Sequence, residues 1–462
     1  MPAGTHPEIR LGLRENLNQF ALLVGVNALV GGMVGLERTL LPIMAEKEYH
    51  LSAHSAILSF LIAFGAAKAF ANYVAGRVSD RVGRKPVLVI GWVLTLPVPF
   101  MLMFAPTWSW IVITNVLLGL GQGLTWSATV LMKIDLVGPE RRGLAMGMNE
   151  FAGYLAVAVS AFLTARIAEV YGLRPNPFLL GIGFAAAGLL LSVVVVRETK
   201  DHADFEQRVA NVPHDFVSAK DAFFRTTWLD RRLRGVTQAG LVNNLNDGVA
   251  WGLLPLLFGQ SGLSLGQVGA LSAAYPAVWG VSQLATGALS DRIGRKALIA
   301  AGMVLQGLAL LAIANVPRLG VPSRFGAWMA CAVALGIGTA MVYPTLLAAI
   351  GDFTRPGWRA SAVGVYRLWR DLGYVAGALI GGALADRFGM STAIAVVGLM
   401  TVGSGLWAES WNPFPRTDQL VNRHVDQRVR TLADHQAIIG AYAADLPHAR
   451  QRLELRLEFR AV

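Results

Sequence analysis

The chain has 462 residues, of which 54% are hydrophobic and only 15% are charged, and its mean hydropathy is +0.49. Soluble domains carry about 25% charged residues, so this composition excludes an ordinary soluble protein and indicates a membrane protein. The net charge of +11 is scattered over many short polar segments, which favours basic cytoplasmic loops over a patch that binds nucleic acid.

Apolar segments of about 20 residues, the length needed to cross a bilayer, follow one another along the chain. They predict an all-α membrane protein with twelve transmembrane helices. The predicted spans are 18–44, 55–76, 87–104, 109–131, 144–168, 177–196, 236–258, 268–287, 297–315, 327–350, 361–384 and 391–409. The first span is too long for the apolar region of a signal peptide, so we expect it to remain in the membrane.

The spans divide the chain into an N-terminal six-helix bundle (1–196), a linker (197–235), a C-terminal six-helix bundle (236–410) and a tail (411–462). Residues 221–235 of the linker mix charged and apolar side chains. This pattern fits a helix that lies along the inner face of the membrane, and it fits a solvated linker equally well.

Lysine and arginine concentrate in the loops on one side of the predicted spans, and the positive-inside rule makes that side cytoplasmic. The basic residues of this side are Arg77, Arg81, Arg84, Lys85, Arg141, Arg142, Arg292, Arg295, Lys296, Arg355 and Arg359. Both termini and the linker then lie in the cytoplasm. We expect a monomer embedded in the lipid bilayer of the plasma membrane, or of the inner membrane in a Gram-negative bacterium.

A short polar segment occurs twice, as GRVSDRVGRKP at 76–86 and as GALSDRIGRKA at 287–297. Each copy forms a loop after the second predicted span of its half, so the two halves have parallel topology. Alternating-access carriers use such repeats. The loop signature consists of Gly76, Asp80, Arg81, Gly83, Arg84 and Lys85, and its second copy of Gly287, Asp291, Arg292, Gly294, Arg295 and Lys296. The double signature in a twelve-span chain resembles the major facilitator superfamily.

The resemblance implies two pseudo-symmetric six-helix bundles that transport by alternating access. In this family the loop latches the halves in the outward-facing state, which implies gating roles for Gly76, Asp80, Arg81, Gly83, Arg84, Asp291 and Arg295. The alternative is that these residues only fix the topology. Two features of drug antiporters are missing: Asn115 occupies the place of an arginine before Gly119, and the span 144–168 lacks a GPxxGG motif.

Ionisable residues inside a span cost about 2.5–3.5 kcal/mol on insertion scales and therefore mark functional sites. Those that lie well away from the span ends are Glu37, Arg38, Lys68, Glu150, Asp247, Arg367, Arg370 and Asp371. The spans at 87–104, 177–196, 297–315 and 391–409 carry no charge before their last residue, which predicts that they face lipid.

Helical spacing aligns polar and aromatic residues into a predicted cavity near the middle of the membrane. Its lining residues are Asn27, Arg38, Lys68, Gln122, Trp126, Asn243, Asn244, Asp247, Trp251, Arg370 and Tyr374. For the amides, hydrogen bonds between helices are the alternative. We assign Glu150, Arg367 and Asp371 to gating or coupling. Because the spans 55–76 and 361–384 face each other in the family fold, Lys68 and Asp371 are expected to pair in one state.

The sequence therefore predicts a secondary active transporter of a small organic solute, driven by protons that Asp247 and Glu150 exchange. Basic residues on the facing spans favour an anionic or amphiphilic substrate, because arginine suits carboxylate oxygens. Trp126, Trp251, Tyr275 and Tyr343 would pack its apolar part. The alternatives are efflux of cationic drug-like compounds at Asp247 and a non-transporting membrane sensor or scaffold.

No catalytic motif or nucleotide-binding loop occurs in the sequence, so we expect neither an enzyme nor a consumer of ATP. The single cysteine, Cys331, excludes an internal disulfide and a Cys-x-x-Cys metal site. We expect no metal ion and no cofactor.

Overall fold

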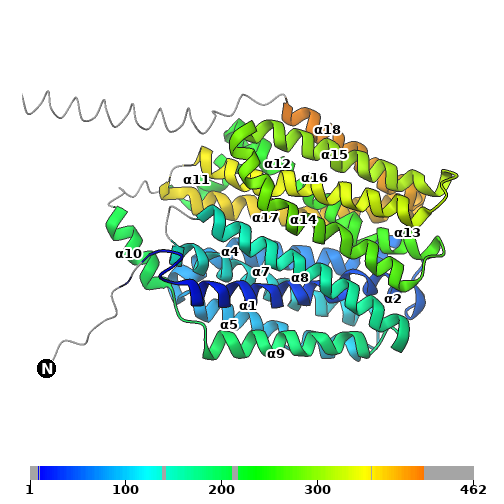
Figure 1. Cartoon of the computed structure of the whole chain (residues 1–462), viewed down its shortest axis with the longest axis horizontal. Coiled ribbons are helices and arrows are strands. Elements are labelled where there is room, and N and C mark those ends of the chain that lie inside the picture. Colours follow the sequence, from blue (N-terminus) through cyan, green and yellow to red (C-terminus); the bar gives the residue numbers. More distant parts are fainter. Residues whose placement is uncertain (1–8, 10, 138–141, 211–216, 355, 410–462) are drawn as a thin grey trace, which may run out of the picture. The chain divides into compact units, whose positions relative to one another are not determined.

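The computed structural model describes residues 9, 11–137, 142–210, 217–354 and 356–409, and within these ranges the chain is helical without strands (Figure 1). The first half contains α1 (Leu17–Arg38), α2 (Leu40–Lys47), α3 (His54–Ile57), α4 (Ser59–Val82), α5 (Arg84–Thr95), α6 (Val98–Met103), α7 (Trp108–Val137), α8 (Arg142–Tyr171), η2 (Asn176–Phe178) and α9 (Leu179–Val194). The second half contains α12 (Arg231–Gly252), α13 (Leu254–Gln260), α14 (Leu265–Ile293), α15 (Arg295–Asn315), η4 (Val316–Arg318), α16 (Arg324–Phe353), α17 (Pro356–Phe388) and α18 (Met390–Glu409). The tail expected at 411–462 lies outside the described residues.

Nine helical segments within the described ranges are long and apolar enough to cross a membrane. They are Leu17–Lys47, His54–Val82, Arg84–Met103, Trp108–Val137, Met146–Tyr171, Asn176–Val194, Arg295–Arg318, Arg324–Phe353 and Met390–Ala408, and each overlaps a predicted span. The three other predicted spans are also helical, in α12–α13, α14 and α17. They carry more polar residues, such as Asp247 and Arg370. The all-α membrane fold is confirmed, and the count of twelve spans stays a prediction.

The two halves meet mainly through two pairs of helices, α4 with α17 and α8 with α14, and also through α3 with α17. Within the first half, α1 packs on α8, and α7 packs on both α4 and α5. Within the second half, α12 packs on α17, and α15 packs on both α16 and α18. Figure 1 shows the first half, in blue to green, below the second half. Helix α4 covers most of the span 55–76 and α17 covers the span 361–384, and these two spans were expected to face each other.

Two glycines on α1 let this helix approach α8 at backbone distance. A Cβ atom at Gly31 would lie 2.1 Å from the carbonyl oxygen of Gly153, and one at Gly35 would lie 2.4 Å from that of Val157. The pair forms a G-x-x-x-G pattern, which is typical of closely packed membrane helices. The second half repeats the device on α17, where Gly373 and Gly377 face carbonyl oxygens of α12.

The substitution Gly31→Ala is expected to destabilise the protein by about 1–3 kcal/mol, because the added methyl group forces the two backbones apart. The measurement is the thermal-unfolding midpoint of the purified protein in detergent. Gly25→Ala is the matched control on the same helix, since nothing lies within 4 Å of a Cβ atom there. Equal midpoints for the two variants would contradict the packing argument.

The repeated polar segment is not the loop expected at 76–86. Helix α4 continues to Val82 and α5 begins at Arg84, so that Gly83, with a φ of +96°, is the only residue between them. The second copy has the same form, with Gly294 at a φ of +96° between α14 and α15. A glycine can adopt this backbone conformation without strain, and one residue therefore suffices to turn the chain.

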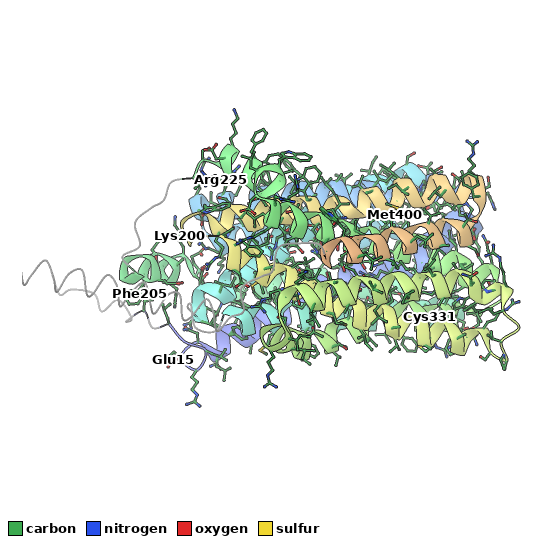
Figure 2. The ribbon with its side chains drawn as sticks, turned by 90° about the horizontal axis from the view of Figure 1, so that it is seen from above. Glu15, Lys200, Phe205, Arg225, Cys331 and Met400 are labelled. Atoms are coloured by element: carbon green, nitrogen blue, oxygen red, sulfur yellow. The ribbon has the colours of Figure 1, made fainter. Side chains whose placement is uncertain are left out.

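The linker contains α10 (Lys200–Ala210), α11 (Ala219–Phe224) and the π-helical turn η3 (Arg225–Leu229), while 211–216 lie outside the described residues. Figure 2 shows Lys200 and Arg225 at the same end of the helices as Glu15. The indole nitrogen of Trp369 on α17 donates to the hydroxyl of Thr227 at 3.0 Å. The linker segment at 219–229 thus packs on the second half, whereas α10 packs on α7 of the first half. The placement of the linker at a membrane surface stays a prediction.

Candidate functional site

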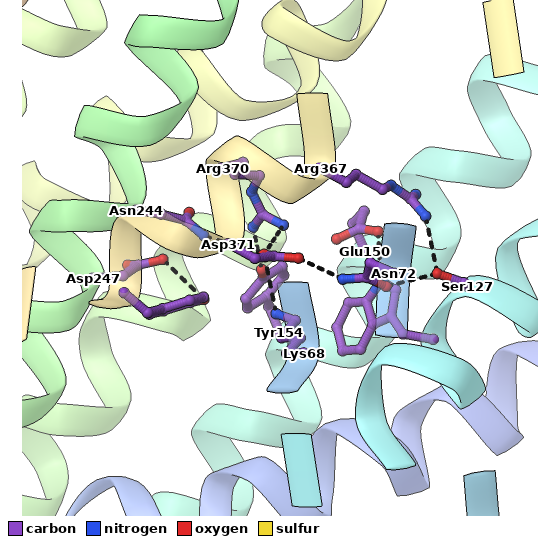
Figure 3. Close-up of polar contacts among 12 residues, drawn as sticks. Lys68, Asn72, Ser127, Glu150, Tyr154, Asn244, Asp247, Arg367, Arg370 and Asp371 are labelled. Atoms are coloured by element: carbon purple, nitrogen blue, oxygen red, sulfur yellow. Dashed lines mark hydrogen bonds and ion pairs between the residues drawn. The ribbon is translucent and has the colours of Figure 1, made fainter. Parts of the chain in front are cut away.

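A buried carboxylate, that of Asp371 on α17, connects the two halves (Figure 3). Its Oδ2 atom accepts a hydrogen bond from the side-chain amide of Asn72 on α4. Its Oδ1 atom lies 3.6 Å from the Nζ atom of Lys68, also on α4, and 3.3 Å from Nη1 of Arg370. The ion pair between Lys68 and Asp371 that the sequence predicts is therefore present.

Two arginines of α17 extend this contact to other helices of the first half. Arg370 donates through Nη2 to the hydroxyl of Tyr154 on α8 at 3.1 Å. Arg367 donates to the hydroxyl of Ser127 on α7 at 3.4 Å, and Ser127 in turn donates to Asn72 at 2.7 Å. One face of α17 thus places three charged side chains against α4, α7 and α8. Figure 3 shows Arg370 beside Asp371, and Arg367 extending away from them toward Ser127.

Asn72 and Tyr154 are central to this network, and the sequence analysis did not identify them. Asn72 lies four residues after Lys68, and Tyr154 lies four residues after Glu150. Residues four apart share a face of a helix. That spacing from a predicted ionisable residue is the signal that could have found both.

Glu150 on α8 is buried beside the network. Its Oε1 atom accepts hydrogen bonds from the indole of Trp126 at 2.8 Å and from the amide of Asn149 at 3.1 Å. Its Oε2 atom is buried and has no hydrogen-bond partner among the described residues. The alternative pairing of Glu150 with Arg367 does not occur among the ion pairs of the described chain.

Asp247 on α12 occupies a separate position in the second half, where it is fully buried. Its Oδ1 atom accepts a hydrogen bond from the hydroxyl of Tyr275, and Oδ2 accepts one from Tyr374 at 3.4 Å. Asn244, one turn earlier, donates instead to Asp371 at 3.5 Å. Both oxygens of the Asp247 carboxylate are thus engaged by tyrosines.

Arg38 on α1 is only 3% exposed and lies over the indole of Trp251 on α12, 3.2 Å from the ring centroid. The predicted cavity residues Arg38 and Trp251 are therefore in direct contact across the two halves. None of the three guanidinium nitrogens of Arg38 has a hydrogen-bond partner within the described ranges.

Three residues predicted to line the cavity have no described hydrogen bond to Asp371 or to Arg38. Asn27 bonds within the first half, to Thr129 at 3.0 Å and to the carbonyl oxygen of Asn149 at 2.7 Å. Asn243 accepts a hydrogen bond from Gln306 within the second half at 3.1 Å. Gln122 is buried in α7. For Asn27 and Asn243 the described contacts are hydrogen bonds between helices, which was the alternative to a role in lining the cavity.

The first copy of the repeated motif forms a buried cluster at one end of the first half. Arg84 lies 3.0 Å from the carboxylate of Asp135 on α7 and 3.2 Å from that of Asp80. The side chain of Asp80 is 71% exposed, whereas those of Arg84 and Asp135 are 8% exposed. Thr199, at the start of the linker, donates to the same carboxylate of Asp135 at 2.9 Å.

Glu198 holds this cluster together, because its carboxylate accepts hydrogen bonds from backbone N–H groups at the starts of two helices, α5 and α10. The donors are Arg84, Lys85, Thr199 and Lys200. Partial burial raises the pKa of Glu198, and these four hydrogen bonds outweigh that effect and bring its pKa below the ordinary value. A Cβ atom at Gly83 would lie 2.4 Å from Oε2 of Glu198, so this contact requires glycine there.

The second copy forms a more open cluster. Arg295 lies 3.2 Å from the carboxylate of Asp352 on α16, and these side chains are 12% and 25% exposed. The side chain of Asp291 lies outside the described part of the structure.

Two further residues of the first copy have few described contacts. Gly76 has open space around it, and the backbone of Arg81 accepts a hydrogen bond from Lys200 at 3.5 Å.

A helical membrane protein whose two halves meet through a buried charged network has the organisation of a solute transporter rather than of an enzyme. The sequence profile of the Major Facilitator Superfamily matches residues 23–237 and 236–444. The chain therefore belongs to the Major Facilitator Superfamily and is a multi-pass membrane transporter.

Several known transporters are similar to this chain. The multi-drug resistance efflux pump PmrA of Streptococcus pneumoniae is 24% identical over 79% of this chain and 88% of its own length. A probable 4-methylmuconolactone transporter of Cupriavidus pinatubonensis is 27% identical over 49% of this chain and 52% of its own length. A crystal structure of a POT family transporter in complex with 5-aminolevulinic acid has a TM-score of 0.67 at 14% identity, covering 84% of this chain and 95% of that one. At that identity the structure supports the fold alone.

Proposed function

We propose that this protein is a secondary active transporter that moves a small organic solute by alternating access and is driven by protons. The network centred on Asp371 is the observation that carries the proposal. It places a lysine, an arginine and a carboxylate at the contact between α4 and α17, where no bulk water screens them. Such charges are costly unless they are paired. Binding of a proton or a substrate that changes these pairs therefore favours a different arrangement of the helices.

The described contacts between the halves support an inward-facing conformation. At the end remote from the repeated motif, the carboxylate of Asp386 on α17 accepts hydrogen bonds from the backbone N–H groups of His54 and Ser55. A Cβ atom at Gly382 of α17 would lie 2.8 Å from the Cα atom of Ser55, so the helices touch there. At the motif end, Asp80 is exposed and pairs with Arg84 of its own half. With the motif on the cytoplasmic side, as its basic residues indicate, the closed end is the outer one.

We assign the binding of the coupling proton to the carboxylate of Glu150. One of its oxygens accepts two hydrogen bonds, while the other is buried without a partner among the described residues. A proton on that oxygen would neutralise a charge that is otherwise costly in this environment. Asp247, the other candidate from the sequence, has tyrosine hydroxyls on both oxygens.

Efflux of cationic drug-like compounds is the second candidate, because a relative that covers most of this chain is named a multi-drug efflux pump. A cation would need Asp247 or Glu150 as its counter-ion. The engaged oxygens of Asp247 favour the anionic or amphiphilic substrate instead.

The test of proton coupling uses the protein in sealed vesicles, with a substrate first found by thermal-shift screening. We expect a pH gradient to drive accumulation and a protonophore to abolish it. Glu150→Gln should lose accumulation and keep exchange of labelled for unlabelled substrate, because exchange requires no net proton movement. Accumulation that survives the protonophore would replace this proposal by facilitated diffusion or by coupling to another ion.

A further inference from the structure

Arg38 is a buried cation without a hydrogen-bond partner in the described structure. It lies at the junction of α1 and α12, which belong to different halves. Among the described residues, the carboxylate of Asp247 acts most strongly on its charge, from beyond ion-pair distance. Leaving a guanidinium unpaired in a dry site costs free energy, since its five N–H groups lose their water. Such a group is expected where an anion completes the site.

The orientation of Arg38 suits a ligand. Its guanidinium carbon lies 3.2 Å from the ring centroid of Trp251, so the ring occupies one face of the cation. The N–H edge of the guanidinium remains for oxygen atoms, and its fork matches the two oxygens of a carboxylate. Trp251 thereby holds the cation in place before the ligand arrives.

A pocket lies beside this cation, bounded by residues of α12, α13, α14 and α16. Its wall is mainly apolar and includes Leu254, Phe258, Leu271, Ala332 and Leu335, together with Trp251. Its polar wall residues besides Arg38 are Ser272 and Tyr275, and the hydroxyl of Tyr275 already donates to Asp247. A cation beside an apolar wall suits a ligand with one anionic group and a hydrocarbon body. The pocket has a volume of only about 20 Å³ in this conformation, so such a body must widen it on binding.

Arg38 and Trp251 also line a second, smaller pocket on the side of the first half, which contains Glu37 and Asn115. The stacked pair therefore stands between two cavities, each lined mostly by one half. A ligand held on Arg38 touches both halves, as a substrate must do if its binding is to favour one arrangement of the halves over another.

We propose that Arg38 and Trp251 form the anion end of the substrate site, and that the substrate class is a monocarboxylic acid with an apolar body seated against Phe258, Leu271 and Leu335. This inference rests on the proposed function and deepens it. It moves the anion site away from the basic residues of the facing spans, Lys68, Arg367 and Arg370, which the sequence favoured. Arg370 is already paired with Asp371 and Tyr154.

The test measures binding to the purified full-length protein with 4-phenylbutyrate as the probe, and with 4-phenylbutylamine and inorganic phosphate as comparisons. We expect the acid to bind, and the amine and phosphate to bind at least tenfold more weakly. Arg38→Gln should weaken binding of 4-phenylbutyrate by at least tenfold, because a charged hydrogen bond is lost. Preferential binding of the amine would overturn the proposal and support the cationic alternative.

In the parent protein 4-phenylbutyrate should raise the thermal-unfolding midpoint, and Arg38→Gln should abolish that rise, because the cation that holds the carboxylate is gone. A rise of equal size in Arg38→Gln would count against a ligand site at this arginine. As a second variant, Ala332→Phe fills the pocket and keeps the cation. It should weaken binding of 4-phenylbutyrate and leave that of propionate unchanged; equal effects on both acids would contradict the seat for the apolar body.

Failure of this site and failure of the proposed function give different results. If Arg38→Gln still accumulates the transported solute with normal affinity, the site is wrong and the transporter stands. If 4-phenylbutyrate binds as expected and vesicles transport neither it nor any solute found by the screen, the site stands and alternating-access transport fails.

Discussion

The variant Asp371→Asn is expected to lose transport by at least 100-fold and to be less stable than the parent protein by about 3–5 kcal/mol. The carboxylate of Asp371 is fully buried and faces both Lys68 and Arg370. Its removal leaves two buried cations without an anion, and an uncompensated buried charge has a cost of about this size. Substrate uptake in vesicles and the thermal-unfolding midpoint measure the two effects.

Asp247→Asn is the matched control for this prediction. Asp247 is equally buried, but its described partners are tyrosine hydroxyls, which can still donate to one amide oxygen. We expect a smaller loss of stability than for Asp371→Asn. Adding Lys68→Met to Asp371→Asn should recover part of the stability and none of the transport, because the stranded lysine is gone while the exchange of partners is not restored. Normal uptake by Asp371→Asn would refute the assignment of this network to alternating access.

The position of the network was predictable because charges in a membrane span are costly and therefore conspicuous. Lys68 and Asp371 were identified by that cost, and counting residues along each helix placed them at matching depth. The facing of their helices came from the family resemblance. Asn72 and Tyr154 are neutral and carry no such cost, so only their position one turn from a charged residue could have pointed to them.

The sequence identified the charged residues inside the spans but not the partner of each one. Arg38 and Arg370 look alike as intramembrane arginines. The structure pairs Arg370 with a carboxylate, whereas it stacks Arg38 on Trp251, a residue 213 positions later in the chain (251 − 38). This contact depends on how the two halves dock, which no local pattern encodes. The role of Glu198 likewise depends on a contact far away in the sequence, with the start of α5 at Arg84, although that contact lies within the first half.

Arg84→Ala is expected to destabilise the protein by about 3–5 kcal/mol and to reduce transport strongly, whereas Arg295→Ala should cost about 1 kcal/mol. The two arginines occupy the same place in the repeated motif. The ion pair of Arg84 with Asp135 is buried, with both side chains 8% exposed, so its loss strands a carboxylate. The pair of Arg295 with Asp352 is 12% and 25% exposed, and water reaches the remaining charge.

A double variant separates the two roles that the sequence left open for this motif, a latch between the halves and a mere determinant of topology. In Arg84→Met combined with Asp135→Leu, no buried charge is stranded, so stability should return to within about 1 kcal/mol of the parent protein. If the motif is part of a latch, transport stays low in this stable protein, because the cluster that orients Asp80 is gone. If the motif only fixes topology, transport returns together with stability, since the basic residues Arg81 and Lys85 remain on the same side. Uptake per correctly folded molecule, measured beside the unfolding midpoint, therefore decides between the roles, and we expect the first result.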